Sequence, residues 1–395
     1  MSQTKAQLVD AVDGSIVAAD LASNSVTTAK VVDSAITADK LIFPVANRNL
    51  IINGAMQVAQ RGTSFSAVQN TFTLDRFKFK RESTAANFTM AQSTTSPDGF
   101  AKRLKMTCTA ADTSTASNEF VMVRHQIEAQ NLQSLGYGTA AAQPSVLSFY
   151  VRSSLTGTYN INFLQIDNSN KIYSRTYTIN SANTWEKKTI SIPADTSGVI
   201  NDDNGVGLQI NFSLILGSTY KGAGVSPTWE SYTNDRFGSQ HGVNFGSSTS
   251  NDWHLTGVQL EVGSVATDFD HRSFGDELLS CQRYYENVKG ASYNEGGNEV
   301  LVANGFNYQT ARCIGNFQFK AEKRARPSVS TDDATEVQVL KTDAGWNSAG
   351  GFGGNSNVYC TRIDCTSISG SPMIAGQGAE IRLINDGIIH FAAEL

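Results

Sequence analysis

The amino-acid sequence predicts an all-β protein with three parts: an N-terminal repeat stalk, an antiparallel β-sandwich resembling a jelly roll, and a second, smaller C-terminal β domain. Roughly nine strand-like segments follow one another at short spacing with turn signals between them, as in a β-sandwich. No long segment has the apolar period of 3.6 residues that is typical of a helix. Charged residues make up only 17% of the chain. This is below the roughly 25% of ordinary soluble domains.

Length and composition limit the domain organisation and the class of partner. A chain of 395 residues is long enough for two or three domains with separate cores. We expect the stalk over residues 1–45, the sandwich over 46–275 and the distal β domain over 276–395. The net charge of −5 argues against nucleic acid as a partner, because no basic stripe would neutralise phosphates. The chain has no run of 18 apolar residues and no apolar signal-peptide core, so we expect synthesis in a cytoplasm without membrane insertion.

Residues 14 to 43 contain a ten-residue repeat, GSIVAADLAS, NSVTTAKVVD and SAITADKLIF. Its apolar positions are Ile16, Val26 and Ile36, and then Leu21, Val31 and Leu41. Two small apolar side chains per ten residues cannot form a core within one chain, whereas several identical chains wound together would bury them. The repeat therefore predicts either a multi-chain stalk or a disordered low-complexity linker.

The sandwich strands are predicted from alternating apolar residues. They are expected at residues 72–80, 103–109, 120–128, 146–154, 158–166, 171–180, 184–192, 205–217 and 254–262. The clearest is GVGLQINFSLILG, where every even-numbered position from Val206 to Leu216 is apolar, which predicts one buried face. Only residues 129–135 indicate a short helical segment.

The stretch from Trp253 to Tyr285 connects the sandwich to the second domain. In its strand HLTGVQLEV, apolar and polar residues alternate, and the alternation is interrupted once at Gly257, which predicts a β-bulge. An extended exit over 266–272 and a short helix within 275–285 follow. Five more strands are expected at 299–307, 313–322, 329–341, 359–367 and 380–395, with an open glycine-rich loop at 345–359.

Two patches carry a family resemblance. NRNLIINGAMQVAQRG (47–62) and VQLEVGSVATDFDHRSFGDELLSCQRYY (258–285) resemble segments of many bacteriophage tail-fibre and receptor-binding proteins. The resemblance implies a jelly-roll fold, a homotrimer and a place in the virion as a tail fibre. It also implies that the stalk attaches to a baseplate or tail protein, and that a β domain recognises a bacterial surface glycan. Either 46–275 or 276–395 could face the cell; the C-terminal domain is favoured, because the stalk at the other end must attach to the particle.

The sequence carries no strong enzyme signature. It has no G-x-S-x-G, H-E-x-x-H or P-loop motif. The five histidines are isolated, and the carboxylate pairs Asp268/Asp270 and Asp332/Asp333 are the kind that a chain rich in loop Asp offers by chance. The five cysteines lack a metal-ligand spacing, so we expect free thiols and no metal or cofactor. Residues 201–205 (NDDNG) either bind Ca²⁺ or form a plain polar turn.

Exposed aromatic side chains are the candidate glycan contacts, because a flat ring can stack on a sugar while neighbouring amides and carboxylates bind its hydroxyls. The candidates are Trp229, Tyr232, Trp346, Phe352 and Tyr359, all in polar or glycine-rich segments. A trimer interface and local packing are the alternative explanations for these rings. Trp185 and Trp253 lie on expected strands and are predicted to be core residues.

The function predicted from the sequence is non-catalytic, multivalent recognition of bacterial surface polysaccharide by a tail fibre. The alternatives are a structural baseplate or fibre spacer protein and a glycan-cleaving fibre. The sequence does not separate recognition from a spacer role, because recognition residues lie in loops without a shared motif.

Overall fold

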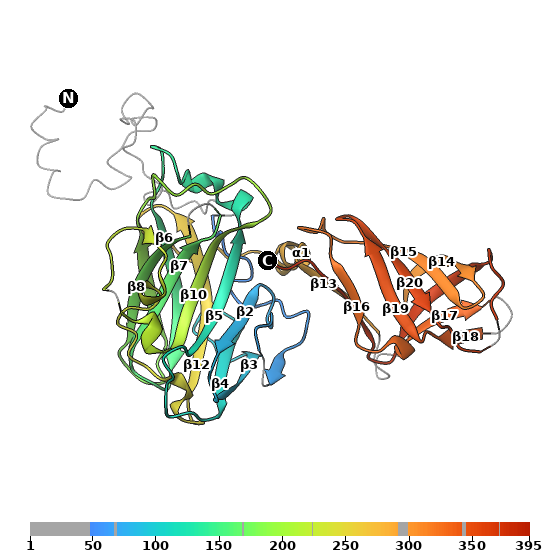
Figure 1. Ribbon diagram of the computed structural model, residues 1–395, viewed down its shortest axis with the longest axis horizontal. Coiled ribbons are helices and arrows are strands. Elements are labelled where there is room, and N and C mark those ends of the chain that lie inside the picture. Colours follow the sequence, from blue (N-terminus) through green and yellow to red (C-terminus); the bar gives the residue numbers. More distant parts are fainter. Residues whose placement is uncertain are drawn as a thin grey trace, which may run out of the picture. The chain divides into compact units, whose positions relative to one another are not determined.

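A computed structural model describes residues 48–66, 69–167, 170–222, 224–290, 299–341, 345–370 and 372–395 (Figure 1). The predicted repeat stalk over residues 1–45 lies outside these described residues. The described chain is almost entirely β, which confirms the all-β prediction.

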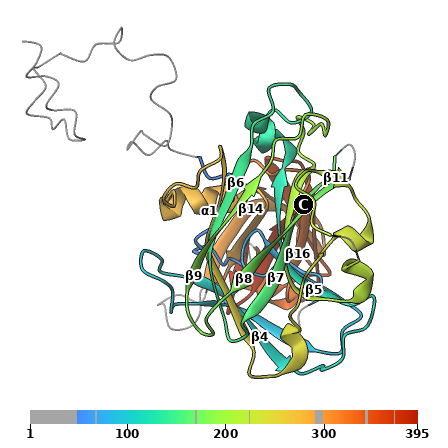
Figure 2. The same ribbon diagram turned by 90° about the vertical axis from the view of Figure 1, so that its left-hand side faces the viewer.

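Two six-stranded antiparallel sheets form the sandwich. Sheet A has the order β1-β3-β4-β12-β6-β9, and sheet B has the order β11-β8-β7-β10-β5-β2. Figure 2 shows the two layers, with β6 and β9 in one and β7 and β8 in the other. The bounds are β1 Ser64–Ser66, β2 Phe77–Glu82, β3 Asn87–Ser93, β4 Arg103–Ala110, β5 Phe120–Glu128, β6 Ser145–Ser153, β7 Gly157–Gln165, β8 Lys171–Ile179, β9 Glu186–Ile192, β10 Val206–Leu216, β11 Glu230–Ser231 and β12 Asp252–Val262. Short 3₁₀ segments lie at η5 Ala129–Leu135, η6 Ser218–Tyr220, η7 Asn234–Arg236 and η8 Phe245–Ser247.

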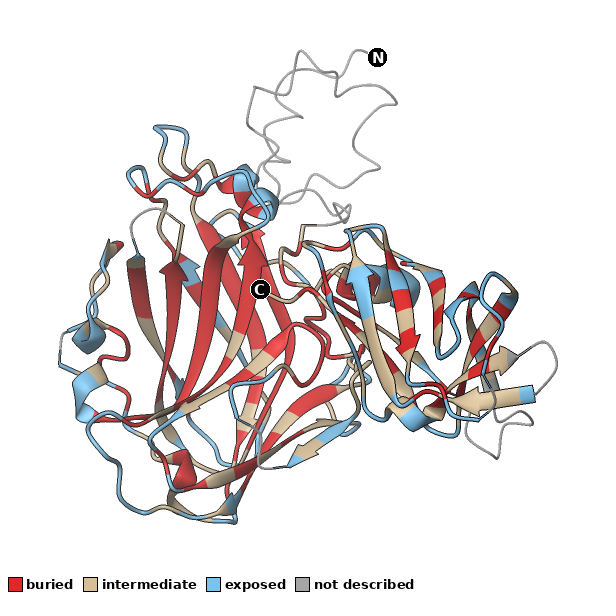
Figure 3. Ribbon diagram, turned by 45° about the vertical axis from the view of Figure 1, so that its right-hand side comes forward, coloured by how far each residue is buried: buried red, intermediate tan, exposed pale blue. Residues whose placement is uncertain are grey.

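The sandwich core lies between the two sheets and follows the predicted alternation with one exception. Leu208, Ile210 and Phe212 of β10 face this core, as expected. A register irregularity between Ser213 and Ile215 then shifts the alternation, so that Leu216 joins a separate apolar cluster rather than the main core. The prediction of one continuous buried face up to Leu216 is therefore wrong. Figure 3 shows how fully the long sandwich strands are buried.

The C-terminal part of the chain contains a three-stranded sheet, β13-β22-β16, and a seven-stranded sheet, β18-β17-β21-β14-β15-β20-β19. The bounds are α1 Phe274–Gln282, β13 Tyr285–Lys289, β14 Glu299–Gln309, β15 Arg312–Gln318, β16 Ser328–Thr331, η10 Ala334–Glu336, β17 Val337–Lys341, β18 Gly345–Ser348, β19 Gly351–Ser356, β20 Cys360–Thr366, β21 Gly378–Ile384 and β22 Ile388–Ala392. Its strands alternate buried with half-buried or exposed residues (Figure 3).

The expected glycine-rich loop is wrong, because its residues form β18 and β19. These strands lie at opposite edges of the seven-stranded sheet, yet only Ala349 and Gly350 separate them. The Ala349 amide donates to the Val337 carbonyl on one side (2.8 Å), and the Gly350 amide donates to the Thr366 carbonyl on the other (3.1 Å). The chain therefore crosses from one edge of the sheet to the other in two residues, and the sheet curls into a half-barrel.

The two patches that carry the family resemblance lie side by side. Asn49 accepts a hydrogen bond from the Leu260 amide (3.1 Å) and donates one to the Val258 carbonyl (3.1 Å). The Val258 amide donates to the Gly54 carbonyl at 3.0 Å. A β-carbon on Gly54 would stand 2.1 Å from the Val258 oxygen, so this approach requires glycine. Gly257 has φ +60° within the register shift of β12, which confirms the predicted bulge.

Helix α1 forms as predicted, but two of its large apolar residues face outward. The Ser273 hydroxyl caps its first turn, and Glu277 is buried against the sandwich, where it accepts the Asn53 amide at 2.5 Å. Burial raises the pKa of Glu277. Phe274 and Leu279 are 55% and 49% exposed, whereas Glu277, Cys281 and Gln282 are the buried residues of the helix.

Ion pairs join the sandwich strands to the C-terminal segments. The Arg76 guanidinium is 1% exposed, pairs with Glu394 near the end of the chain, and lies 3.5 Å from the centre of the Tyr284 ring. Arg283 pairs with the buried Glu128 at 2.9 Å. The first pair ties the end of the chain to the residue just before β2, and the second ties the residue after α1 to the end of β5.

Candidate functional site

The two sandwich aromatics among the candidates are not exposed platforms. Trp229 is only 9% exposed; its ring lies in the main core, and its Nε1 donates to the Pro193 carbonyl at 2.9 Å. The expectation that this ring lacks a core is therefore wrong. Tyr232 is half-buried against the separate apolar cluster that contains Leu216, and its hydroxyl donates to Asn234 at 2.9 Å.

The three C-terminal candidates lie in different settings. Trp346 is on edge strand β18, where the Arg382 guanidinium lies 3.6 Å from the centre of its ring. Phe352 is on the opposite edge strand β19 and packs against the half-barrel core. Tyr359 is 56% exposed in the turn before β20. The five candidates therefore do not converge on one site.

Of the two core predictions for tryptophan, one is confirmed and one is wrong. Trp253 is fully buried in the sandwich core. Trp185 instead lies half-buried beside the outward-facing His254, with ring centres 6.0 Å apart. Burial and the nearby Arg103 lower the pKa of His254 to about 3. A neutral imidazole accepts the hydrogen bond from Arg152 at 2.8 Å.

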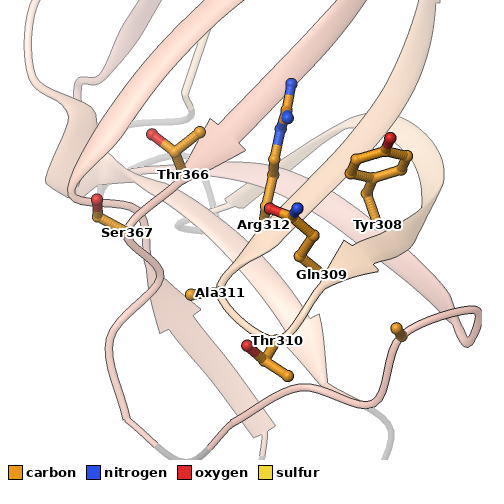
Figure 4. A pocket seen from close by; sticks show the side chains of 8 residues that line it. Tyr308, Gln309, Thr310, Ala311, Arg312, Thr366 and Ser367 are labelled. Carbon is orange, nitrogen blue, oxygen red and sulfur yellow. The ribbon is translucent and has the colours of Figure 1, made fainter.

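A depression of about 690 Å³ opens on the seven-stranded sheet, where the β14–β15 hairpin meets the end of β20 (Figure 4). Its lining residues are Tyr308, Gln309, Thr310, Ala311, Arg312, Thr366, Ser367 and Ala375. In Figure 4 the Arg312 side chain stands in the middle, with Tyr308 on one side and Thr366 and Ser367 on the other. The volume lies within the range typical of small-ligand sites.

An aromatic ring and an ion pair are the main chemical features of this depression. Tyr308 is 50% exposed, and the Arg312 guanidinium lies 5.1 Å from the centre of its ring. Arg312 also makes a two-point ion pair with Asp364 of β20, with Nε 2.8 Å from Oδ1. This hydrogen bonding raises the pKa of Arg312. The guanidinium is therefore held in one orientation with further N–H donors facing outward.

The glycine-rich strand β19 borders this surface. Gly351 pairs with Thr366, and Gly353 pairs with Asp364. A β-carbon on Gly351 would stand 2.5 Å from the Thr366 hydroxyl oxygen, whereas one on Gly353 would meet nothing within 4 Å. Because these glycines have no side chains, the paired side chains of β20 stay uncovered. Strand β19 therefore leaves space beside the depression and contributes no aromatic ring to its lining.

Sequence reasoning missed Tyr308, Arg312 and Asp364. Tyr308 lies near the end of a strand, where aromatic residues are common whether they are buried or exposed. The sequence therefore does not indicate that its ring is exposed. Arg312 and Asp364 are 52 residues apart and meet only because β15 and β20 pair in register. The one available hint was the hairpin turn Gln309-Thr310-Ala311, which interrupts two strand-like runs.

The polar candidates Asp332, Asp333 and residues 201–205 are engaged in local structure. Asp332 contacts His390 at 2.8 Å, and Asp333 caps the short segment η10 by accepting the Thr335 amide at 2.8 Å. In residues 201–205, the Asp203 carboxylate accepts the Gly205 amide at 2.7 Å, as a plain polar turn requires.

Within the described ranges, no group of three or more His, Cys, Asp or Glu side chains is arranged to hold a metal ion. All five cysteines are free, as expected, and Cys360 alone is partly exposed. No helix in the described part of the chain has both the length and the apolar character needed to cross a bilayer.

No protein-family model matches this chain, and no curated protein matches it in sequence. Weak structural similarity connects it to the enzymatically active domain of tailspike protein 4 from bacteriophage CBA120, with TM-score 0.28 and 11% identity over 50% of this chain. That match spans only 21% of the tailspike chain. A family 11 carbohydrate-binding module from Clostridium thermocellum matches with TM-score 0.28 and 8% identity, covering 52% of this chain and 98% of the module. A putative sugar-binding protein from Bacteroides thetaiotaomicron matches with TM-score 0.29 and 12% identity, covering 54% of this chain and 99% of the other. Scores this low establish neither a family nor a ligand.

Proposed function

We propose that this chain is a receptor-binding subunit of a phage tail fibre that binds a bacterial surface glycan through the depression beside Tyr308. The observation that carries the proposal is the half-exposed Tyr308 ring next to the Arg312–Asp364 pair on an open concave surface. The sequence resemblance to tail fibres supplies the biological setting.

The chemistry of the depression suits a sugar. The apolar face of a pyranose stacks on an aromatic ring, and its hydroxyls need both donors and acceptors at the edge of the site. Tyr308 offers the ring, and Arg312 offers N–H donors. The hydroxyls of Thr366 and Ser367 and the amide of Gln309 offer both donors and acceptors. An open surface of this size accommodates a segment of polysaccharide rather than one enclosed small molecule.

We further propose that binding occurs without cleavage. Glycoside hydrolysis requires one carboxyl group as a proton donor and a second as base or nucleophile. Asp364, the carboxylate nearest to Arg312, is held in a two-point ion pair, which suits a fixed hydrogen-bond acceptor. Release of reducing ends from host polysaccharide by the purified protein would contradict this part of the proposal.

Weak single sites become effective when several are presented together. A homotrimer with a virion-attached stalk would carry three copies of the depression on one rigid body, and avidity then exceeds the affinity of one site. Three chains per particle, measured by light scattering of the full-length protein, is the expected assembly.

The test is retention of fluorescently labelled full-length protein on host cells, before and after the surface polysaccharide is stripped. We expect saturable retention that is lost on stripping. We expect Tyr308→Ala to weaken each site about tenfold, because the stacking contribution of one ring is of this order. The loss on cells is larger where several sites act together.

Tyr359→Ala is the matched control, since Tyr359 is equally exposed but lies outside the lining of the depression. It should leave retention unchanged. A reversed result, with loss at Tyr359 and none at Tyr308, would move the site away from the depression. No retention of the wild-type protein on any host of the parent virus would favour the spacer role.

A further inference from the structure

A second hollow, of about 210 Å³, lies on the outer face of sheet A and is separate from the depression on the half-barrel. It is assembled from distant stretches of the chain: the loop before β4, strands β6 and β9, the bulge of β12 and the exit segment that follows β12. The side chains that matter most are Phe100, Tyr150, Phe269, Asp98, Asp268 and Lys187.

An aromatic cluster outside the core forms one side of this hollow. The Phe100 ring centre lies 5.4 Å from that of Tyr150, 5.0 Å from that of Phe269 and 5.3 Å from that of His271. Phe100, Tyr150 and Phe269 are each only half-buried, and His271 is exposed. Large rings that gather on a surface rather than in a core mark an interaction site.

The bulge at Gly257 lets these rings approach the strand. A β-carbon at this position would stand 2.6 Å from Phe100 and 3.0 Å from Tyr150, and its φ of +60° disfavours other residues. The backbone of β12 therefore forms part of the wall of the hollow. The rings of Phe100 and Tyr150 lie closer to this backbone than a side chain at position 257 would allow.

Two carboxylates at the edge of the hollow have no partner among the described residues. The carboxylates of Asp98 and Asp268 make no hydrogen bond or ion pair with any described residue, and both residues are exposed. The Lys187 ammonium lies 5.9 Å from the centre of the Tyr150 ring. The hollow thus combines aromatic surface with two free acceptors and one cationic donor.

We propose that this hollow binds one pyranose residue of a polysaccharide, as a second carbohydrate site on the same chain. The apolar face of the sugar stacks on the ring cluster, while Asp98 and Asp268 accept hydrogen bonds from its hydroxyls and Lys187 donates one. The hollow is smaller than the several hundred Å³ of a drug-sized ligand site, which limits it to one sugar ring. The inference shares only its ligand class with the proposed function and stands on different residues.

The test is saturation-transfer NMR on the full-length protein, with the methyl glycosides of glucose, galactose, mannose and N-acetylglucosamine as probes. All measurements use the Tyr308→Ala background, in which binding at the depression on the half-barrel is expected to be about tenfold weaker. We expect at least one glycoside to receive saturation, and Phe269→Ala to weaken its binding about tenfold.

Two further variants keep the result interpretable. Asp268→Asn is isosteric and preserves the backbone carbonyl that accepts Arg48 and Gln259, so it tests recognition without a change of fold. Val265→Ala, in the same exit segment and 57% exposed, lies outside the hollow and should leave binding unchanged.

Three outcomes would overturn the inference. The first is an absence of saturation of all four glycosides in the Tyr308→Ala background. The second is saturation that neither Phe269→Ala nor Asp268→Asn reduces. The third is a change in the number of chains per particle when Phe269 is replaced, which would make this face an interface between copies. Loss of cell retention in Tyr308→Ala with sugar binding intact would support both sites independently.

Discussion

Neighbours, rather than residue type, decide what each aromatic side chain does in this protein. Trp229 and Tyr308 both follow segments that contain polar residues. Trp229 is nevertheless enclosed in the sandwich core, whereas Tyr308 is half-exposed. The enclosure of Trp229 depends on Tyr137 and Tyr173, whose ring centres lie 5.9 and 5.7 Å away. Those partners are 92 and 56 residues distant in the chain, so no local pattern could indicate them.

Buried histidines make the sandwich sensitive to acid. His241 is 3% exposed; its Nδ1 accepts the Asn160 amide at 3.2 Å, and its Nε2 has no hydrogen-bond partner among the described residues. Burial lowers its pKa to about 4. An unfolded histidine takes up a proton near pH 6.5, whereas the folded one resists protonation until about pH 4. Its contribution to stability is therefore complete above pH 6.5 and is lost as the pH falls toward 4.

We predict that His241→Asn removes a part of this pH dependence equal to about 3 kcal/mol between pH 6.5 and 4, because each unit of pKa difference corresponds to about 1.4 kcal/mol. The free energy of unfolding in urea, measured at several pH values, tests this. An equal slope in variant and wild type would show that His241 does not contribute to the acid sensitivity.

At the scale of elements, local pattern determines the strands, and bulges and close approaches determine how they pack. Most strand segments expected in the sandwich form close to their expected bounds, because alternation buries one face wherever two sheets pack. The segment expected at 72–80 is the exception, since its strand β2 begins only at Phe77 and extends to Glu82. Strands β1, β3 and β11 were missed: β1 and β11 span only three and two residues, whereas β3 spans seven, of which only Phe88 and Met90 are buried. Strands β18 and β19 were missed because glycine is depleted in ordinary strands.

Gly54 is predicted to be essential to the contact between the two patches. We expect Gly54→Ala to lower the free energy of unfolding by about 1–3 kcal/mol, the usual cost of overpacking, because its β-carbon would overlap the Val258 oxygen. Gly275→Ala is the matched control: it lies in helix α1, with only Ser273 Oγ near its β-carbon at 3.9 Å. The control should be neutral or stabilising by up to about 1 kcal/mol. Equal effects of the two changes in denaturant unfolding would contradict the close approach.

At the scale of the whole described chain, charged contacts join segments that fold into different sheets. Arg76 of the sandwich is enclosed by Tyr284 and paired with Glu394, and Lys323 pairs with Glu286 at 2.6 Å with both side chains fully buried. Buried pairs of this kind are costly to break, because the remaining charge is left without compensation.

We predict that Glu394→Gln lowers stability by about 3 kcal/mol, since it leaves the buried Arg76 with a neutral partner. Calorimetry should show one cooperative transition for the wild type and two for the variant, because the contact between the C-terminal residues and the sandwich is weakened. Lys289→Gln is the control, as the pair of Lys289 with Asp386 is exposed at 58% and 71% and is expected to contribute little. A single unchanged transition in the variant would show that the Arg76–Glu394 pair is not needed to couple these segments.

The sequence by itself determined the fold class, most sandwich strands, the bulge at Gly257 and helix α1, because each depends on side-chain periodicity or turn chemistry within a few residues. It also identified the two patches that meet through Asn49 and Leu260, though only as a resemblance. The tertiary structure alone decided which rings are exposed, how β18 and β19 close the half-barrel, and where Arg312 meets Asp364. The physical reason is strand pairing: register brings residues from distant segments onto one surface, and no local pattern records which segments will be neighbours.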